Sequence, residues 1–135
     1  MIIALALVLF SIYLAYEHFF NPSSFWKPYL SSLPPSFKNI LPVEWSDTDI
    51  DILKGTPIYH IIKDRIKLIN DSVEMIRDVL KCYPLPDGKQ WNVKFSQIAW
   101  ACGVISSRAF PRKNEENDTT ELCLYPVLDM VLCFN

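Results

Sequence analysis

Residues 56–80 read TPIYHIIKDRIKLINDSVEMIRDVL, the longest regular pattern in this chain of 135 residues. Its apolar residues recur in steps of three and four, which traces one face of an α-helix. They are Ile58, Ile61, Ile62, Ile66, Ile69, Val73, Ile76 and Leu80. Pro57 suits the first helical position, where a backbone N–H is not needed. The charges between the apolar positions predict a solvated face rather than a partner site. We therefore expect a long amphipathic helix that begins at Pro57.

The C-terminal side of this helix contains a second, shorter helical pattern. A proline-containing loop is predicted over residues 83–90, and residues 95–105 then repeat the spacing of three and four. Residues 112–120 are charged and polar and predict a loop. Residues 121–130 are apolar again and fit either a short strand or a helical turn.

The N-terminal side contains two cap signals. Ser46, followed by acidic residues, predicts the start of a helix that ends at Gly55. Ser23 or Ser24 is placed to cap a short helix after an Asn-Pro break. No alternating pattern is strong enough to build a sheet, so the predicted fold class is mostly α, with little or no β-sheet.

Composition limits the classes of function. Half of the residues are hydrophobic, which gives ample material for a core and excludes a disordered chain. The net charge is −2, so a nucleic-acid partner is not expected. The three glycines, Gly55, Gly88 and Gly103, are far apart, which excludes a glycine-rich phosphate loop.

The cysteines and histidines show no spacing typical of a metal site or a catalytic set. No two cysteines form a C-x-x-C pair, and neither histidine lies within four residues of a cysteine, so no metal is expected. We expect His18 and His60 to be packing or surface residues. The four cysteines are expected to be free, mostly buried thiols in a reducing compartment. They are Cys82, Cys102, Cys123 and Cys133.

The N-terminal segment allows three interpretations. Residues 2–16 read IIALALVLFSIYLAY, which is uncharged and apolar on all sides. A signal peptide or anchor would have a basic start, a spanning helix needs about 20 apolar residues, and a helix buried in a larger protein needs neighbours all round. The buried helix is the preferred interpretation, and it is a first hint that further structure surrounds this chain.

Two charged residues lie in apolar surroundings. Asp129 follows Val127 and Leu128, and Arg108 lies at the end of the helical pattern of residues 95–105. A buried acid normally needs a partner. The two residues are either helix-end and loop charges or a polar lining that faces a ligand or another segment.

Four sequence blocks resemble one family when taken in order. Residues 24–34 resemble S-x-W-x-P-Y-L-x-x-L-P, and residues 45–56 resemble a W-x(n)-L-x-G-T segment. Residues 100–110 resemble W-A-x(n)-S-R-A-F, and residues 124–130 resemble the start of P-x-x-D-M-x-N-H. These blocks are similar to those of SET-domain protein methyltransferases of the Rubisco large-subunit methyltransferase-like group. The resemblance favours a buried N-terminal helix.

The resemblance implies an activity and a set of site residues. Members transfer a methyl group from S-adenosylmethionine to a lysine, or in some members a histidine, of a protein substrate. By resemblance, Arg108, Asp129 and Met130 bind the methyl donor and Ser107 binds the substrate. A guanidinium suits the carboxylate of the donor. The family catalytic tyrosine has no candidate here, and a membrane partner is not expected.

The chain departs from the family pattern after Met130. Leu132 and Cys133 stand where the family has asparagine and histidine. By resemblance, residues 1–110 are the helical insert of a split SET domain. Residues 111–130 then begin its C-terminal half, and residues 131–135 are a divergent, truncated tail. We expect a fragment that is inactive alone, in the cytoplasm or nucleus.

Two other functions stay open. One is a non-catalytic helical interaction module that uses the apolar surface left exposed. The other is a membrane-anchored helical protein, held through residues 2–16.

Overall fold

The computed structural model describes the backbone of residues 2–38, 40–83, 85, 88–114 and 119–133, and within these ranges the side chains of residues 7–131. The protein is mostly α-helical, as predicted, and the described residues contain one two-stranded antiparallel sheet. The elements are α1 (Ile2–Phe19), α2 (Lys27–Ser32), a 3-10 turn η1 (Pro42–Glu44), α3 (Asp47–Asp51), α4 (Pro57–Cys82), α5 (Phe95–Arg108), β1 (Phe110–Asn114), β2 (Thr119–Cys123) and α6 (Pro126–Cys133).

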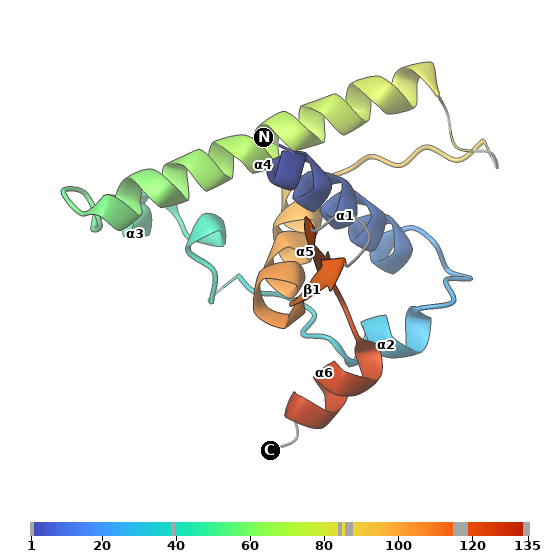
Figure 1. Ribbon diagram of the computed structural model, residues 1–135. Coiled ribbons are helices and arrows are strands. Elements are labelled where there is room, and N and C mark those ends of the chain that lie inside the picture. The colour runs from blue at the N-terminus through green and yellow to red at the C-terminus, as the bar shows by residue number, and fades with distance from the viewer. Residues whose placement is uncertain (1, 39, 84, 86–87, 115–118, 134–135) are drawn as a thin grey trace.

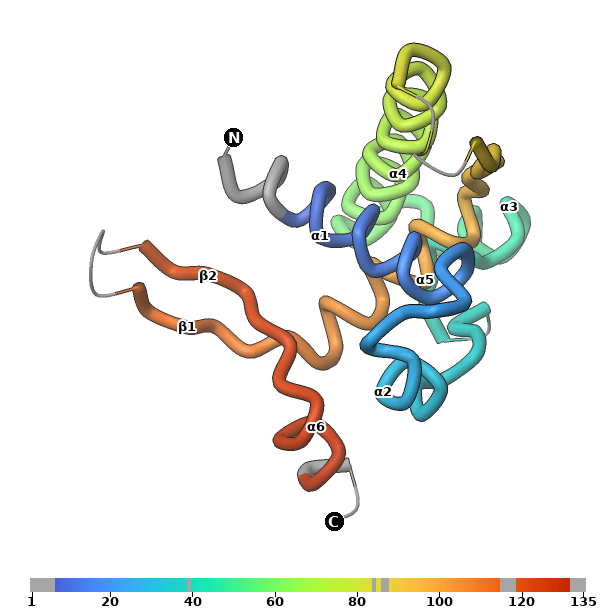
Figure 2. The backbone as a smooth tube through the Cα atoms, turned by 90° about the vertical axis from the view of Figure 1, so that its right-hand side faces the viewer, coloured from blue at the N-terminus to red at the C-terminus, as the bar shows by residue number. Residues whose placement is uncertain are grey.

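The core forms where α1, α4 and α5 meet. Helix α5 packs against both α1 and α4, and Figure 1 shows α4 running across the other two. Half of the residues of α5 are buried, including Trp100 and Val104, because the helix packs between its neighbours. From this helical body the β1–β2 ribbon extends outward and leads into α6 (Figure 2).

Helix α4 has the predicted start and the predicted buried stripe. Thr56 is its N-cap residue, and Ile62, Ile69, Val73 and Ile76 are buried. The prediction is wrong near the start of the helix, where Ile58 and Ile61 are 50% and 60% exposed. A helix of 26 residues is about 39 Å long, whereas α5, with 14 residues, is about 21 Å long. Because α4 is longer than α5, part of α4 has no partner along α5.

Helix α1 is buried on one side only. Ser11, Leu14 and Ala15 are at most 5% exposed, whereas Leu9 and Tyr13 are 56% and 49% exposed. The Ser11 hydroxyl donates to the Leu7 carbonyl at 2.8 Å, which satisfies it inside the core. Among the described residues, no helix combines the length and the hydropathy needed to cross a bilayer.

The predicted cap of α3 is present, with one boundary shifted, whereas the N-cap residue of α2 is Trp26 and neither Ser23 nor Ser24. Ser46 is the N-cap of α3 and its Oγ accepts the Asp49 N–H at 3.3 Å. Helix α3 ends at Asp51 rather than at Gly55, because turns follow it, and Gly55 then takes a φ of +87°. Ser24 Oγ accepts the Trp26 N–H at 3.1 Å just before α2.

The loop predicted over residues 112–120 is wrong where the structure describes it. Residues 112–114 and 119–120 belong to β1 and β2, and Arg112 pairs with Glu121 across the ribbon. Most of these strand residues are exposed. A ribbon without a buried face needs no alternation of apolar and polar residues, so the pattern that predicts strands is missing. Residues 121–130 are predicted to form either a strand or a helical turn, and they contain both: the end of β2 and the start of α6.

Trp100 links three segments of the core. Its indole N–H donates to the Pro34 carbonyl at 2.8 Å, and its ring stacks on His18 with centroids 4.2 Å apart. Phe19 meets the same ring edge-on at 5.2 Å. Trp100 is 2% exposed, so its side of these contacts is shielded from water. Trp100 therefore holds the end of α1 and the segment after α2 against α5.

Partial burial lowers the pKa of His18 below its ordinary value. The unfolded chain therefore takes up a proton near the ordinary pKa of about 6.5, before the folded chain does. We expect the free energy of unfolding to fall as the pH drops from about 6.5 towards the lower pKa of the folded state. Urea unfolding at about pH 7.5 and about pH 5 measures this loss. The variant His18→Phe keeps an aromatic stack without the titration, so its loss should be smaller. Equal losses in both proteins would contradict the role of His18.

Candidate functional site

Arg108 and Asp129 form a largely buried ion pair between the end of α5 and the first turns of α6. Arg108 Nη1 lies 3.0 Å from each oxygen of the Asp129 carboxylate. The side chains are 20% and 5% exposed, so the pair is shielded from solvent on most sides. Of the two interpretations that the sequence leaves open, the structure favours the one in which these residues face another segment.

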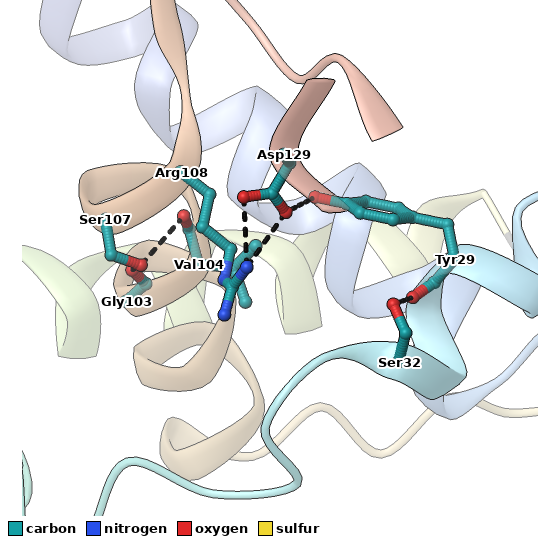
Figure 3. A network of polar contacts seen from close by, with 7 residues as sticks. All are labelled: Tyr29, Ser32, Gly103, Val104, Ser107, Arg108 and Asp129. Atoms are coloured by element: carbon teal, nitrogen blue, oxygen red, sulfur yellow. Dashed lines mark hydrogen bonds and ion pairs between the residues drawn. The ribbon is translucent and has the colours of Figure 1, made fainter. Parts of the chain in front are cut away.

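Tyr29 adds a third element to this pair. Its hydroxyl donates to Asp129 Oδ2 at 2.9 Å, in a buried contact between residues 100 positions apart. We refer to these three residues as the Tyr29–Asp129–Arg108 network, which Figure 3 shows at the meeting point of α2, α5 and α6. A buried carboxylate is expensive unless it is paired and hydrogen-bonded, and here both oxygens are engaged. The network therefore fastens α6 to the helical body.

Ser107 and Met130 lie next to the network in the sequence but are arranged differently. Ser107 is exposed, and its hydroxyl donates to the carbonyls of Gly103 at 2.8 Å and Val104 at 3.3 Å, within its own helix. Met130 is 40% exposed. One residue along a helix turns the side chain by about 100°, so Met130 points in a different direction from Asp129. Of the four residues predicted for the site, the structure brings Arg108 and Asp129 into direct contact.

A small apolar cavity of about 100 Å³ adjoins the network. Tyr29 forms part of its wall, as do Tyr13 and Trp26, and the Trp26 indole N–H donates to the Tyr13 hydroxyl at 3.2 Å. The lining residues come from α1, α2 and the segment that leads into α6. They are Phe10, Tyr13, Leu14, Glu17, Trp26, Tyr29, Leu30, Leu124 and Pro126. Sequence periodicity does not reveal this cavity, because the residues lie in three separate segments, one of which is far from the other two in the sequence.

The remaining titratable and thiol groups that the structure describes include no cluster suited to a metal ion. Within the part of the chain that the structure describes, no three His, Cys, Asp or Glu residues are arranged to hold a metal ion. Cys82, Cys102 and Cys123 are free, as predicted, but Cys82 is exposed and the others are only partly buried. The expectation of mostly buried thiols is wrong for Cys82, which ends α4 in an exposed position, whereas Cys102 packs against the core and Cys123 is partly buried in the ribbon. Cys133 lies outside the described side chains. His60 is exposed, in agreement with the prediction.

Comparison with known proteins identifies distant relatives. The chain is 28% identical over 115 residues to "[Fructose-bisphosphate aldolase]-lysine N-methyltransferase, chloroplastic" of Arabidopsis thaliana, an alignment that covers 83% of this chain and 22% of that protein. It is 24% identical over 112 residues to the actin-histidine N-methyltransferase of Dasypus novemcinctus, over 82% of this chain and 19% of the relative. The chain is a distant relative of protein N-methyltransferases. No family model and no solved structure matches it.

A third relative bears on the resemblance noted in the sequence. This is the chloroplastic large-subunit N-methyltransferase of ribulose-1,5-bisphosphate carboxylase/oxygenase from Pisum sativum. The identity is 25% over 115 residues, which cover 80% of this chain and 21% of that enzyme. The predicted similarity to protein methyltransferases of the Rubisco type is thus confirmed at this level. The chain spans about a fifth of the length of the relatives that it matches.

Proposed function

We propose that this chain is the helical part of a SET-domain protein N-methyltransferase that uses S-adenosylmethionine. Residues 1–110 correspond to the helical insert, residues 111–130 to the start of the C-terminal half, and residues 131–135 to a divergent tail. The observation that carries the proposal is the buried ion pair of Arg108 and Asp129 at the junction of the first two parts. Four sequence blocks in family order and the methyltransferase relatives support it.

Arg108 fits a role in holding the methyl donor. A guanidinium carries five N–H donors in a planar fork, and Asp129 engages the terminal nitrogen Nη1. The side chain is 20% exposed, so part of it reaches the surface beside α6. The carboxylate of S-adenosylmethionine is the kind of group that such a fork binds. When bound, the donor supplies an electrophilic methyl group, and Arg108 would orient it.

Asp129 fits an indirect role better than direct contact with the donor. Its side chain is 5% exposed, and its oxygens accept from Arg108 and Tyr29. We therefore assign Asp129 to holding Arg108 in place. Ser107 and Met130 keep the roles implied by the family, substrate and donor binding, and their exposure leaves them accessible to a molecule at this surface.

The proposed substrate is a lysine or histidine side chain of a protein. The relatives include enzymes named for each residue type, so the choice between them is not part of the proposal. The family asparagine and histidine are replaced by Leu132 and Cys133, and no catalytic residue is assigned within this chain. Methyl transfer requires an amine held in line with the methyl group in a pre-oriented site. We therefore expect no methyl transfer from this chain alone.

Calorimetry with S-adenosylmethionine tests whether this chain alone binds the methyl donor, which methyl transfer requires. We expect no heat of binding at micromolar donor, because Arg108 supplies one anchor for a ligand that needs several. Micromolar binding by the 135-residue chain would contradict the inactivity.

A chimera tests the assignment of this chain to a methyltransferase. The matched segment of the Arabidopsis enzyme is replaced by this chain with Leu132→Asn and Cys133→His. We expect the chimera to bind the donor, and Arg108→Ala to weaken its affinity at least tenfold. Unchanged affinity would contradict the role of Arg108.

A second candidate function is supported by the exposed apolar surface of α6. Val127, Leu128 and Val131 are 78%, 45% and 57% exposed, and exposed apolar patches mark contact surfaces. A non-catalytic module would use this surface to bind the rest of a longer methyltransferase. Light scattering after size-exclusion chromatography checks whether the surface drives association by itself. A monomer at all concentrations would count against the module.

Compartment and partners follow from the same proposal. Free thiols fit a reducing compartment, so we propose the cytoplasm or nucleus. The proposed partner is a protein substrate, and neither a nucleic acid nor a membrane is proposed.

A further inference from the structure

The geometry of the Tyr29–Asp129–Arg108 network raises the question of what fixes the plane of the carboxylate. Arg108 Nη1 is equidistant from the two carboxylate oxygens, at 3.0 Å from each. This nitrogen by itself does not set the tilt of the carboxylate about its last bond, because the terminal torsion of an aspartate is broad. A second donor on one of the oxygens restricts this torsion.

Tyr29 supplies that second donor. Its hydroxyl lies 2.9 Å from Oδ2 and the contact is buried. A hydrogen bond to an ionised acceptor is stronger than one between neutral groups, and burial strengthens it further. The ring of Tyr29 is itself held, because the residue is 7% exposed and lines the apolar cavity beside α1. The position of the Tyr29 hydroxyl is therefore fixed relative to α1 and α2.

We infer that Tyr29 is a positioning residue for Arg108. It fixes the carboxylate of Asp129, and this carboxylate in turn fixes the guanidinium. The consequence for donor binding rests on the proposed function, since Arg108 matters to the donor only if the chain belongs to a methyltransferase. The positioning itself is a property of this chain and can be measured without a donor.

Nuclear magnetic resonance of the labelled 135-residue chain tests the inference. The measured quantity is the rate of rotation about the Cζ–Nη bonds of Arg108. The variant Tyr29→Phe keeps the ring and the cavity wall and removes only the hydroxyl. We expect the rate to rise about three- to tenfold, the range that corresponds to the loss of one hydrogen bond.

Tyr13→Phe is the matched control. Tyr13 lines the same cavity, and its hydroxyl bonds to Trp26 rather than to the network. We expect this variant to leave the rotation of Arg108 unchanged. An unchanged rate in Tyr29→Phe, or an equal rise in Tyr13→Phe, would overturn the positioning role, because a purely structural tyrosine would give one of these results.

A second measurement covers the case in which Tyr29→Phe does not fold. Replacing Tyr29 by 3-fluorotyrosine keeps the ring and strengthens the phenol as a donor. We expect the rotation of Arg108 to become slower than in the natural chain, and an equal or faster rate would overturn the inference. If the donor assays fail while Arg108 responds as expected, the methyltransferase assignment is wrong and the role of Tyr29 stands. If the donor assays succeed while the rotation of Arg108 does not respond, the methyltransferase assignment stands and the role of Tyr29 is wrong.

Discussion

Replacing Trp100 by alanine is expected to lower the free energy of unfolding by about 3–5 kcal/mol. The residue is 2% exposed, and its removal would leave a cavity between α1 and α5. The substitution also removes the stack on His18 and leaves the Pro34 carbonyl without the indole N–H. A loss of this size is a large part of the stability of a typical domain. Urea unfolding, followed by far-ultraviolet circular dichroism, measures it.

Two further variants separate the contributions of the tryptophan. Trp100→Phe keeps an aromatic ring and loses the N–H, so we expect a smaller loss of roughly 1–3 kcal/mol. Phe25 is 84% exposed, and Phe25→Ala should change stability by less than about 0.5 kcal/mol. If Trp100→Ala costs no more than Phe25→Ala, Trp100 is not the link that the structure shows.

Replacing Asp129 by alanine should destabilise the chain by about 2–4 kcal/mol. The change leaves the Arg108 guanidinium largely buried without its counter-charge, and it leaves the Tyr29 hydroxyl without the carboxylate. An unpaired buried charge is costly because water no longer solvates it. We place the estimate below the range for fully buried pairs because the Arg108 side chain is 20% exposed. Hydrogen exchange should show faster opening of α6, because the network fastens this helix to α2 and α5.

The double variant Arg108→Met with Asp129→Leu tests the cause of this loss. It removes both charges and puts apolar groups in their place, so it should be less destabilised than Asp129→Ala alone. An equal or greater loss would show that the charge left behind is not the main penalty. Glu121→Ala, in the exposed ribbon, serves as a control with an expected change of less than about 0.5 kcal/mol.

Local signals in the sequence predict most of the helical elements. The spacing of isoleucines predicts α4, and Ser46 predicts the start of α3, because both depend only on residues within a few turns. The ribbon escapes prediction since neither face of its strands is buried. The exposure of Ile58 and Ile61 near the start of α4 is not predicted either, because exposure depends on which segments pack against α4 and not on the pattern of α4 itself.

The site is only partly accessible from the sequence. An acid in an apolar segment predicts that Asp129 needs a partner, and Arg108 is the nearest charged residue in an apolar context. Tyr29 lies 100 residues away from Asp129, and no periodicity connects them. The one available signal is that Tyr29 belongs to the W-x-P-Y-L block, which points to a family but not to a contact. No sequence pattern predicts the apolar cavity, because three separate segments build it.

The β1–β2 ribbon has edges to which a further strand can pair. A two-stranded ribbon has an edge on each side, and within the described residues no third strand pairs with either edge. Such edges present backbone donors and acceptors in register for a further strand. Pro111 has no backbone N–H, so β1 has one donor fewer for pairing with a further strand, while its other backbone groups can still pair. The ribbon is therefore suited to seed a larger sheet. The same edges would template unwanted pairing between copies of the chain as its concentration rises.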